Sequence, residues 1–418
     1  MIKRKLFSEL VDHLPQKEMS LIIGPRQAGK TTIMEMLKKY LDDRGKRTLF
    51  LNLDIEWDRP HLKSQAALLR KIELELGQQH GYVFIDEIQR KDDAGLFLKG
   101  LFDLKMPYKF IISGSGSLEL KQKIHESLAG CKRLFELPTV SLEEFINHRT
   151  DYRYEENLAD FLAIEIDRAL QLLLEYMQFG GYPRILTAME QREKLRLIDE
   201  IYRSVIEKDI AYLLKLDKPD VFSALIKVLA GQVGQLMNYT ELASTLNVSF
   251  ATVKKYLWYA QKIFLVELIA PYARNVRKEI SKSPVPYFWD LGLRNYALGL
   301  FGHLESPLEK GFVFENLIFL LLRQKLRFKA AKLNYWRTKD KAEVDFVIED
   351  GKRLIPLEVK FKRLKQVNVP ASLRSFISKY NPEQAYIINL DLSKNLKINK
   401  TKLFFMPFYE LLRRTTIL

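Results

Sequence analysis

The eight residues from Gly24 to Thr31 constrain the fold of this chain more than any other feature. They read Gly-Pro-Arg-Gln-Ala-Gly-Lys-Thr, which fits the pattern G-x-x-x-x-G-K-[ST]. The apolar run Leu21–Ile23 precedes them and a helical pattern follows, which is the setting in which a glycine-rich loop wraps phosphate with backbone N–H groups. The predicted nucleotide-binding residues are Gly24, Pro25, Arg26, Gln27, Ala28, Gly29, Lys30, Thr31 and Thr32.

Two residues of this loop have predicted chemical roles. We expect the ammonium group of Lys30 to bridge the β- and γ-phosphates of ATP, and the hydroxyl of Thr31 to bind Mg²⁺. The alternative, a glycine turn with an exposed lysine, leaves the strand and helix on either side unexplained. ATP and Mg²⁺ are therefore the predicted ligands.

Two further strand ends carry candidate catalytic residues. Asp86 and Glu87 follow an apolar run; Asp86 is suited to hold Mg²⁺ through water, and Glu87 to polarise the attacking water. Such a pair is common after a strand, but 56 residues beyond a phosphate-binding loop it supports a hydrolytic site. Ser113 ends another apolar run, where it would sense the γ-phosphate or orient the water. An ordinary serine–glycine turn is the alternative for Ser113.

Residues 18–115 alternate apolar runs of strand length with helical patterns. Short buried strands separated by helices are typical of a mostly parallel sheet covered on both faces, so the predicted fold class is α/β. The predicted strands are Met19–Gly24, Thr48–Leu53, Tyr82–Asp86 and Tyr108–Ser113. The helical patterns between them are Lys30–Asp43, Lys63–Leu76 and Ala94–Leu104. From residue 154 to about 216 the pattern is helical, with one turn at Gly180-Gly181-Tyr182-Pro183.

Residues 219–275 carry three helical patterns and then an apolar run. We expect Thr240 to cap the second helix and Ser249 to cap the third, Phe250–Lys262. Two short helices across a three-residue turn, followed by a strand, predict a winged helix-turn-helix. This unit would bind DNA phosphates through Lys254 and Lys255. Packing of the third helix on a protein partner or on the sheet domain is the alternative.

The chain resembles the AAA+ superfamily of ATPases, and more closely a widespread group of bacterial and archaeal AAA-type ATPases with a C-terminal nuclease-like domain. Relatives often continue Ser-Leu-Ala-Gly with arginine, whereas this chain has Cys131 there, so Arg133 is the substitute candidate for an arginine finger that acts on a neighbouring subunit. The resemblance therefore implies a homo-oligomer. It rests on the motifs Gly24–Thr32, Phe84–Gln89, Ser127–Gly130, Gly180–Pro183, Asp290–Asn295 and Trp336–Thr338.

The predicted units are an AAA+ P-loop ATPase core at 1–150, a helical lid at 151–217, a winged helix-turn-helix at 218–290 and a nuclease-like domain at 291–418. In the last of these, Asp350-Gly351 is a preferred centre for a two-residue hairpin turn. That turn would set Glu343 opposite Glu358 and place Glu343, Asp345, Glu358 and Lys360 on one face of the hairpin. Val344 and Phe346 would fill the other face.

These carboxylates predict a second metal site. Asp345 and Glu358 would share one Mg²⁺, Glu315 of an upstream helical run would add a third carboxylate, and Lys360 would orient the nucleophile. The set resembles the PD-(D/E)xK pattern of restriction-endonuclease-like domains, which implies cleavage of DNA. A solvated hairpin face with salt-bridged charges explains the same residues, and so does a nuclease-like fold without chemistry.

The net charge of +15 is concentrated near the C-terminus, where residues 310–418 hold 23 Lys and Arg against 10 Asp and Glu. This asymmetry predicts a polyanion, DNA, which would also contact Lys360, Lys362, Arg363 and Lys365. A lysine-rich surface kept for solubility is the alternative.

Other features bear on the expected location of the protein. The longest apolar run, Leu317–Leu322, is six residues, far short of the ~20 that span a bilayer. Cys131 is the single cysteine, so no internal disulfide forms. Ser8 and Glu9 interrupt the basic start, so we expect no signal peptide and a cytoplasmic location.

Two classes of function remain. The first is an ATP-driven machine that acts on DNA through the winged-helix and nuclease-like units. The second is a nucleotide-dependent switch or scaffold whose C-terminal domain is catalytically inactive and binds a protein or nucleic acid.

Overall fold

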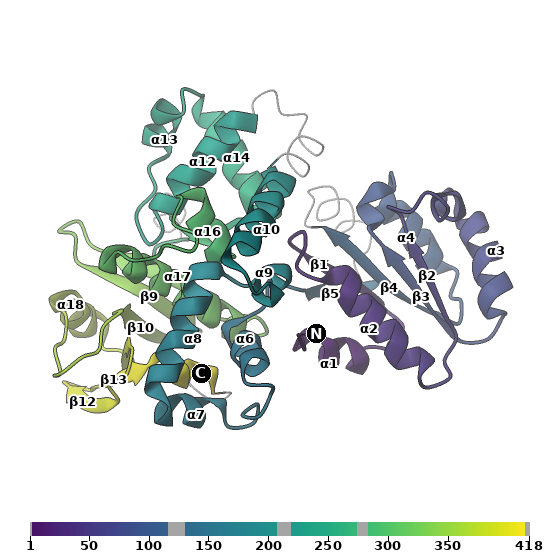
Figure 1. Cartoon of the computed structure of the whole chain (residues 1–418). Helices are drawn as coiled ribbons and strands as arrows, with labels where there is room; N and C mark the ends of the chain where they lie inside the picture. Colours follow the sequence, from purple (N-terminus) through teal and green to yellow (C-terminus); the bar gives the residue numbers. More distant parts are fainter. Residues whose placement is uncertain (1, 116–129, 207–218, 274–282, 414–418) are drawn as a thin grey trace.

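The computed structural model describes residues 2–115, 130–206, 219–273 and 283–413 (Figure 1). An N-terminal sheet with its helices forms one end of the molecule and a C-terminal sheet forms the other, with helices between them. The predicted α/β class is confirmed. None of the helices in the described ranges is both long and apolar enough to cross a membrane.

The N-terminal sheet is entirely parallel, with the strand order β2-β3-β4-β1-β5. Successive side chains of a strand point to opposite faces, so Leu21 and Ile23 pack with α3 and α4, while Ile22 packs with α1 and α2. The strands are β1 (Met19–Gly24), β2 (Thr48–Asn52), β3 (Gly81–Asp86), β4 (Tyr108–Ser115) and β5 (Lys132–Glu136). The helices are α1 (Leu6–Asp12), α2 (Lys30–Asp42), α3 (Gln65–Leu76) and α4 (Ala94–Asp103), with short 3-10 turns η1 (Arg59–Leu62) and η2 (Ile88–Arg90).

A helical layer follows the sheet. Its helices are α6 (Leu142–Arg149), α7 (Leu158–Ile164), α8 (Ile166–Phe179), α9 (Pro183–Thr187), α10 (Gln191–Arg203) and α12 (Pro219–Gly231). The expected turn separates α8 from α9: Gly180 has φ +73°, and a Cβ on Gly181 would lie 2.2 Å from the carbonyl oxygen of Val140. Both glycines are therefore needed where the helical layer meets the end of the N-terminal sheet.

The predicted helix-turn-helix corresponds to α13 (Tyr239–Thr245) and α14 (Phe250–Lys262), followed by the antiparallel pair β6 (Val266–Ile269) and β7 (Val285–Phe288). Ser249 caps α14 as expected, because its side chain accepts the Thr252 N–H. The prediction that Thr240 caps α13 is wrong. The cap is Asn238, whose side chain accepts the N–H groups of Thr240 and Glu241, so Thr240 lies inside the first turn.

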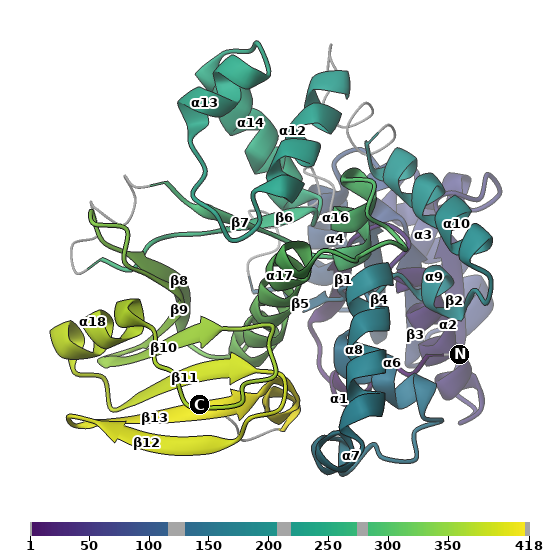
Figure 2. The same ribbon diagram turned by 60° about the vertical axis from the view of Figure 1, so that its left-hand side comes forward.

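The C-terminal sheet has six strands in the order β12-β13-β11-β10-β9-β8. Helix α17 covers one face and α18 the other, and Figure 2 shows the sheet between them. Its strands are β8 (Lys332–Arg337), β9 (Glu343–Asp350), β10 (Arg353–Val359), β11 (Gln384–Asn389), β12 (Lys394–Ile398) and β13 (Thr401–Pro407). Its helices are α16 (Leu291–Ala297), α17 (Pro307–Leu326), α18 (Ala371–Tyr380) and the 3-10 turn η4 (Phe408–Leu412).

The predicted hairpin between β9 and β10 forms, but its register is wrong by two residues. Arg353 pairs with Asp350 and Leu357 with Phe346, so Asp345, and not Glu343, is next in line with Glu358. The turn consists of residues 351–352, because Gly351 takes up the positive φ of +60°.

The prediction that Val344 and Phe346 share a face is also wrong. The ladder between β8 and β9 is irregular between Asn334 and Trp336. As a result Val344 packs under α18, whereas Phe346 packs under α17.

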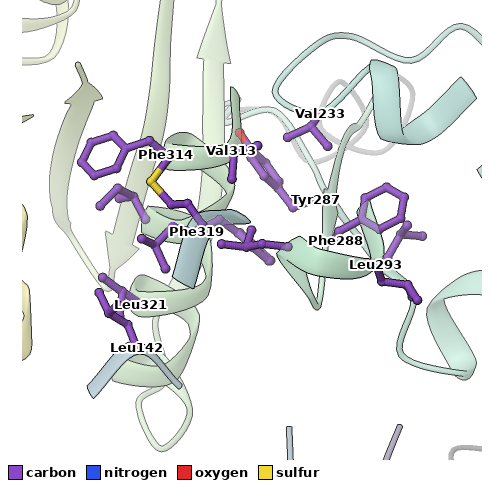
Figure 3. Packing of buried hydrophobic residues seen from close by; sticks show 14 of the residues in the cluster. Leu142, Val233, Tyr287, Phe288, Leu293, Val313, Phe314, Phe319 and Leu321 are labelled. Carbon is purple, nitrogen blue, oxygen red and sulfur yellow. The ribbon is translucent and has the colours of Figure 1, made fainter. Parts of the chain in front are cut away.

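Strand β7 is fixed to α17 by a buried amide. The Oδ1 atom of Asn316 accepts the Phe288 N–H at 2.8 Å, and its Nδ2 donates to the Phe288 carbonyl at 2.7 Å. Figure 3 shows Tyr287 beside Val313 of α17. The Tyr287 and Phe319 rings stack with centroids 4.6 Å apart. This contact joins the helix-turn-helix unit to the C-terminal sheet.

We predict that Asn316→Ala destabilises the protein, because it removes a partner from two buried backbone groups. Each group left unsatisfied costs about 1–3 kcal/mol. Urea unfolding should therefore show a lower midpoint than wild type. The matched control is Gln324→Ala, an exposed amide on the same helix, which should shift the free energy of unfolding by less than about 0.5 kcal/mol. Equal losses in the two variants would contradict the role of Asn316.

Candidate active site

The phosphate-binding loop lies between β1 and α2, as predicted. Gly29 caps α2 with φ +96°, and Gln27 also has a positive φ, of 57°. A Cβ on Gly24 would lie 2.1 Å from the carbonyl oxygen of Leu137, so only glycine fits there. The loop therefore turns its backbone tightly around the start of α2, where N–H groups and the helix dipole favour an anion.

Lys30 is buried within this loop. Its ammonium group donates to the carbonyl oxygens of Gly24 at 3.1 Å and Pro25 at 2.8 Å. A phosphate group bound in the loop would offer this cation a charged acceptor in place of carbonyl oxygens. Of the other predicted nucleotide-binding residues, Thr32 is exposed and Arg26 is half-buried.

Asp86 is the centre of a polar cluster at the carboxyl edge of the sheet. Thr31 Oγ1 donates to Asp86 Oδ2 at 2.6 Å, and Ser113 Oγ donates to Asp86 Oδ1. Asn52 Nδ2 lies 3.4 Å from the same Oδ2. These side chains meet because β2, β3, β4 and β1 are parallel neighbours and end together. A hydroxyl and a carboxylate are the hard oxygen ligands that Mg²⁺ prefers, so the residues present fit a magnesium nucleotide.

Glu87 lies beside this cluster in a left-handed conformation, with φ 57°. Its backbone N–H donates to Asp86 Oδ1 at 3.0 Å, and the Gln89 amide donates to its carboxylate. Burial raises the pKa of Glu87, while the nearby charge of Lys30 lowers it. The net upward shift suits a carboxylate that accepts a proton from water.

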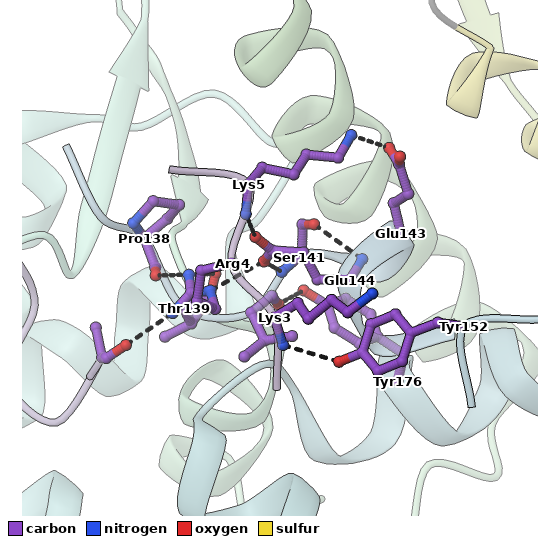
Figure 4. Close-up of polar contacts among 12 residues, drawn as sticks. Lys3, Arg4, Lys5, Pro138, Thr139, Ser141, Glu143, Glu144, Tyr152 and Tyr176 are labelled. Atoms are coloured by element: carbon purple, nitrogen blue, oxygen red, sulfur yellow. Dashed lines mark hydrogen bonds and ion pairs between the residues drawn. The ribbon is translucent and has the colours of Figure 1, made fainter. Parts of the chain in front are cut away.

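Two arginines contact the loop that the sequence analysis did not identify. Arg4 is buried and donates to the Ala28 carbonyl at 2.9 Å, to the Pro138 carbonyl and to Glu144 (Figure 4). Arg184, the first residue after the Gly-Gly-Tyr-Pro turn, lies 3.3 Å from Gln27 Oε1. Neither belongs to a local motif, because tertiary packing alone brings them to the loop. Asn52 could have been identified from the sequence, because it lies at the end of a predicted strand, and that strand is next to β3 in the sheet.

Arg133 lies far from the loop of its own chain. It is exposed on the edge strand β5 and pairs with Ser20, near the opposite end of β1 from Gly24. The neighbouring part of its motif, residues 127–129, lies outside the described residues. The role of Arg133 as an arginine finger stays a prediction.

The C-terminal carboxylates come together in a buried environment. Tyr287 donates to Glu315 Oε1 at 2.7 Å, the Val359 N–H donates to Asp345 Oδ2 at 2.6 Å, and Lys360 pairs with Glu358 at 2.8 Å. Burial, and next the charge of Asp345, raise the pKa of Glu315 and of Glu358 to about 8. Burial also raises the pKa of Asp345.

This cluster does not form the predicted metal site. Among the described residues, no group of three or more His, Cys, Asp or Glu is arranged to hold a metal ion. Glu315 is turned toward Tyr287 of β7, and Asp345 is used by the backbone of β10. Glu343 forms an ion pair with Arg337 of β8 at 2.8 Å. In contrast, Glu358 Oε2 is buried and has no hydrogen-bond partner among the described residues.

The predicted DNA-binding residues form two separate groups. Lys254 and Lys255 are exposed on α14. Lys360, Lys362, Arg363 and Lys365 follow β10. Arg363 is paired with Asp167 at 2.6 Å and lies 3.7 Å from Asp391.

Comparison with known proteins matches most of the chain in three parts. Residues 16–146 match the AAA domain, residues 170–304 a domain of unknown function (DUF8612) and residues 310–410 another (DUF4143). The uncharacterized protein Rv2008c of Mycobacterium tuberculosis is 30% identical over 363 residues, which are 85% of this chain and 72% of that protein. The chain belongs to the family of this mycobacterial protein. An uncharacterized protein of Haemophilus influenzae is 24% identical over 375 residues, 87% of each chain.

Among solved structures, the chain resembles Aeropyrum pernix ORC1 in complex with DNA, with 12% identity and a TM-score of 0.30 over 70% of this chain and 91% of that one. It also resembles Cdc6p of Pyrobaculum aerophilum, with 10% identity and a TM-score of 0.29 over 76% and 97%. These likenesses are too distant to carry a functional inference. The phosphate-binding loop and Asp86-Glu87 both lie within the AAA match, so this is the P-loop domain of an AAA+ protein.

We predict that Glu87→Gln keeps ATP bound but lowers kcat by about 10²–10⁴-fold, because the amide cannot accept a proton. The ionised carboxylate is the active form, so wild-type kcat should fall as the pH drops through the raised pKa of Glu87. The residual rate of the variant should lack this acid limb. Phosphate release measured across pH tests both points. Glu73→Gln, an exposed change on α3, is the control, and wild-type turnover in Glu87→Gln would contradict the assignment.

Proposed function

We propose that this chain binds and hydrolyses Mg²⁺·ATP at the phosphate-binding loop and couples the cycle to DNA. One observation carries the hydrolytic part: the 2.6 Å contact between Thr31 Oγ1 and Asp86 Oδ2. It brings a hydroxyl of the loop helix and a carboxylate of the neighbouring strand to one point beside the buried Lys30. A magnesium nucleotide needs this combination of ligands and cation.

The residues of the chain then have distinct tasks. Lys30 exchanges loop carbonyls for the β- and γ-phosphates, and Thr31 and Asp86 hold the metal, which offsets phosphate charge when bound. Glu87 takes the proton of the attacking water. Ser113 is fully buried and keeps Asp86 in place, so its contribution is to position that carboxylate.

Assembly of several copies is part of the proposal. Arg133 is exposed at the sheet edge and distant from the loop of its own chain, so it would act on nucleotide bound by a neighbouring subunit. The proposed units are the ATPase core to about residue 150, the helical lid to 217, the winged helix-turn-helix to 290 and the C-terminal domain beyond.

DNA is the proposed polyanion because of where the charge lies. Residues 310–418 hold 23 of the basic residues against 10 acidic ones, and α14 presents Lys254 and Lys255 outward. Phosphate contacts of this kind release counterions and give affinity without sequence preference.

The second candidate, a nucleotide-dependent switch with a binding-only C-terminal domain, is favoured by the state of the carboxylate cluster. One oxygen each of Glu315, Asp345 and Glu358 is bonded to a protein group, and the described residues form no three-ligand metal site. We therefore derive no cleavage step from them. In the switch, ATP binding controls assembly and the C-terminal domain holds a protein or nucleic acid.

Lys30→Ala should abolish ATP turnover, with a loss of at least about 10²–10³-fold, because it removes the buried cation that faces the phosphates. Steady-state phosphate release, with and without DNA, is the measurement. Lys38→Ala is the matched control, since Lys38 lies on the same helix but pairs with Asp42 at the surface. DNA-stimulated turnover supports the machine, and slow turnover without stimulation supports the switch. Wild-type turnover in Lys30→Ala would contradict both.

A further inference from the structure

Helix α14 carries an outward stripe in which aromatic and basic side chains alternate. Phe250, Lys254, Trp258 and Lys262 recur at every fourth residue, so they share one face of the helix at steps of about 6 Å. The Phe250 side chain is 46% exposed, Lys254 is exposed, and Trp258 and Lys262 are half-buried. The buried side of the helix is formed by a different set, Val253, Tyr256, Leu257, Tyr259 and Ala260. The half-buried Trp258 also packs against this core, so only part of its side chain is accessible.

The cations of the stripe lie over the aromatic rings. The ammonium group of Lys254 is 4.7 Å from the centroid of Phe250 and 5.9 Å from that of Tyr239 on α13. The ammonium group of Lys262 is 5.5 Å from the centroid of Trp258. Tyr239 and Phe250 have centroids 5.7 Å apart, so the two helices present one aromatic patch. The surface thus offers ring faces and positive charges side by side.

This chemistry is suited to unpaired bases and not to the edges of base pairs. A helix that reads a duplex in the major groove uses Arg or Lys for guanine and Asn or Gln for adenine. Residues 250–258 contain no Arg, Asn or Gln, and Lys254 and Lys255 are the guanine readers that this segment offers. Exposed rings give each unstacked base a partner, worth about 1–3 kcal/mol per base, while lysines contact the phosphates between them. Between residues 238 and 263 the chain has three lysines and one glutamate, which favours an anionic ligand.

We propose that Tyr239 and the stripe Phe250–Lys254–Trp258–Lys262 bind single-stranded DNA, by stacking of bases on the rings and by contact of phosphates with the lysines. This inference rests on the proposed function, because it names the form of DNA on which the ATPase acts. The binding has little sequence preference, since each base has a ring face.

The test is fluorescence anisotropy of the full chain with a labelled oligothymidylate and with a duplex of equal length, at several salt concentrations. Wild type should prefer the single strand. Phe250→Ala should weaken that binding by about 5- to 150-fold, the loss of one stacked base, and Phe250→Trp should restore it. Lys254→Ala should reduce the salt slope by about 0.7, the value for one phosphate contact with a single strand.

The matched control is Phe328→Ala. Phe328 is 72% exposed and its ring also lies beside a cation, Arg327, at 4.8 Å, but outside α14. This variant should bind oligothymidylate like wild type. Rescue by Phe250→Trp separates loss of stacking from loss of folding.

Two results would overturn the inference while leaving the proposed function standing: a preference for the duplex, or unchanged single-strand affinity in Phe250→Ala. If wild-type protein with ATPase activity bound neither the single strand nor the duplex at low salt, DNA would no longer be part of the proposed function.

Discussion

The carboxylate of Asp290 holds together the parts of this protein on which the site depends. It is buried, and it accepts the Gly181 N–H at 2.8 Å and the Leu293 N–H at 2.9 Å. One oxygen thus caps α16, and the other fixes the turn between α8 and α9. That turn places Pro183 beside Gly29 of the phosphate-binding loop. The shape of the nucleotide site is therefore tied to a residue 260 positions further along the chain.

Residues 287–290, the short stretch that ends at Asp290, connect several parts of the molecule. Three of these four consecutive residues contact side chains of α17, and the fourth contacts the turn between α8 and α9. The contacts are Tyr287 with Glu315, Phe288 with Asn316, Trp289 with Arg323, and Asp290 with Gly181. Arg323 in turn pairs with Glu136 of β5 at 2.8 Å. If the turn between α8 and α9 moved when nucleotide bound, these contacts would therefore transmit the movement to β7 and to the carboxylate cluster.

Local patterns in the sequence predicted β1 to β4, α2 to α4 and the phosphate-binding loop to within a few residues, because residues close together in the chain determine these apolar runs and spacings. Helix α1 was not predicted. Contacts between distant segments were not predictable. Arg4 and Arg184 reach the loop only through tertiary packing. Strand β5 was not predicted either, since its edge position leaves Arg133 and Leu134 exposed. The hairpin register failed because Gly351 begins the turn where Asp350 was expected to.

The central claim is that the loop around Lys30, with Thr31 and Asp86, binds a magnesium nucleotide. Titration calorimetry of the full chain with a non-hydrolysable ATP analogue, once with Mg²⁺ and once with a chelator, tests it most directly. The account predicts one site per chain with higher affinity in Mg²⁺ than in chelator, because Thr31 and Asp86 contribute only through the metal. No heat of binding, or an affinity that Mg²⁺ leaves unchanged, would contradict it.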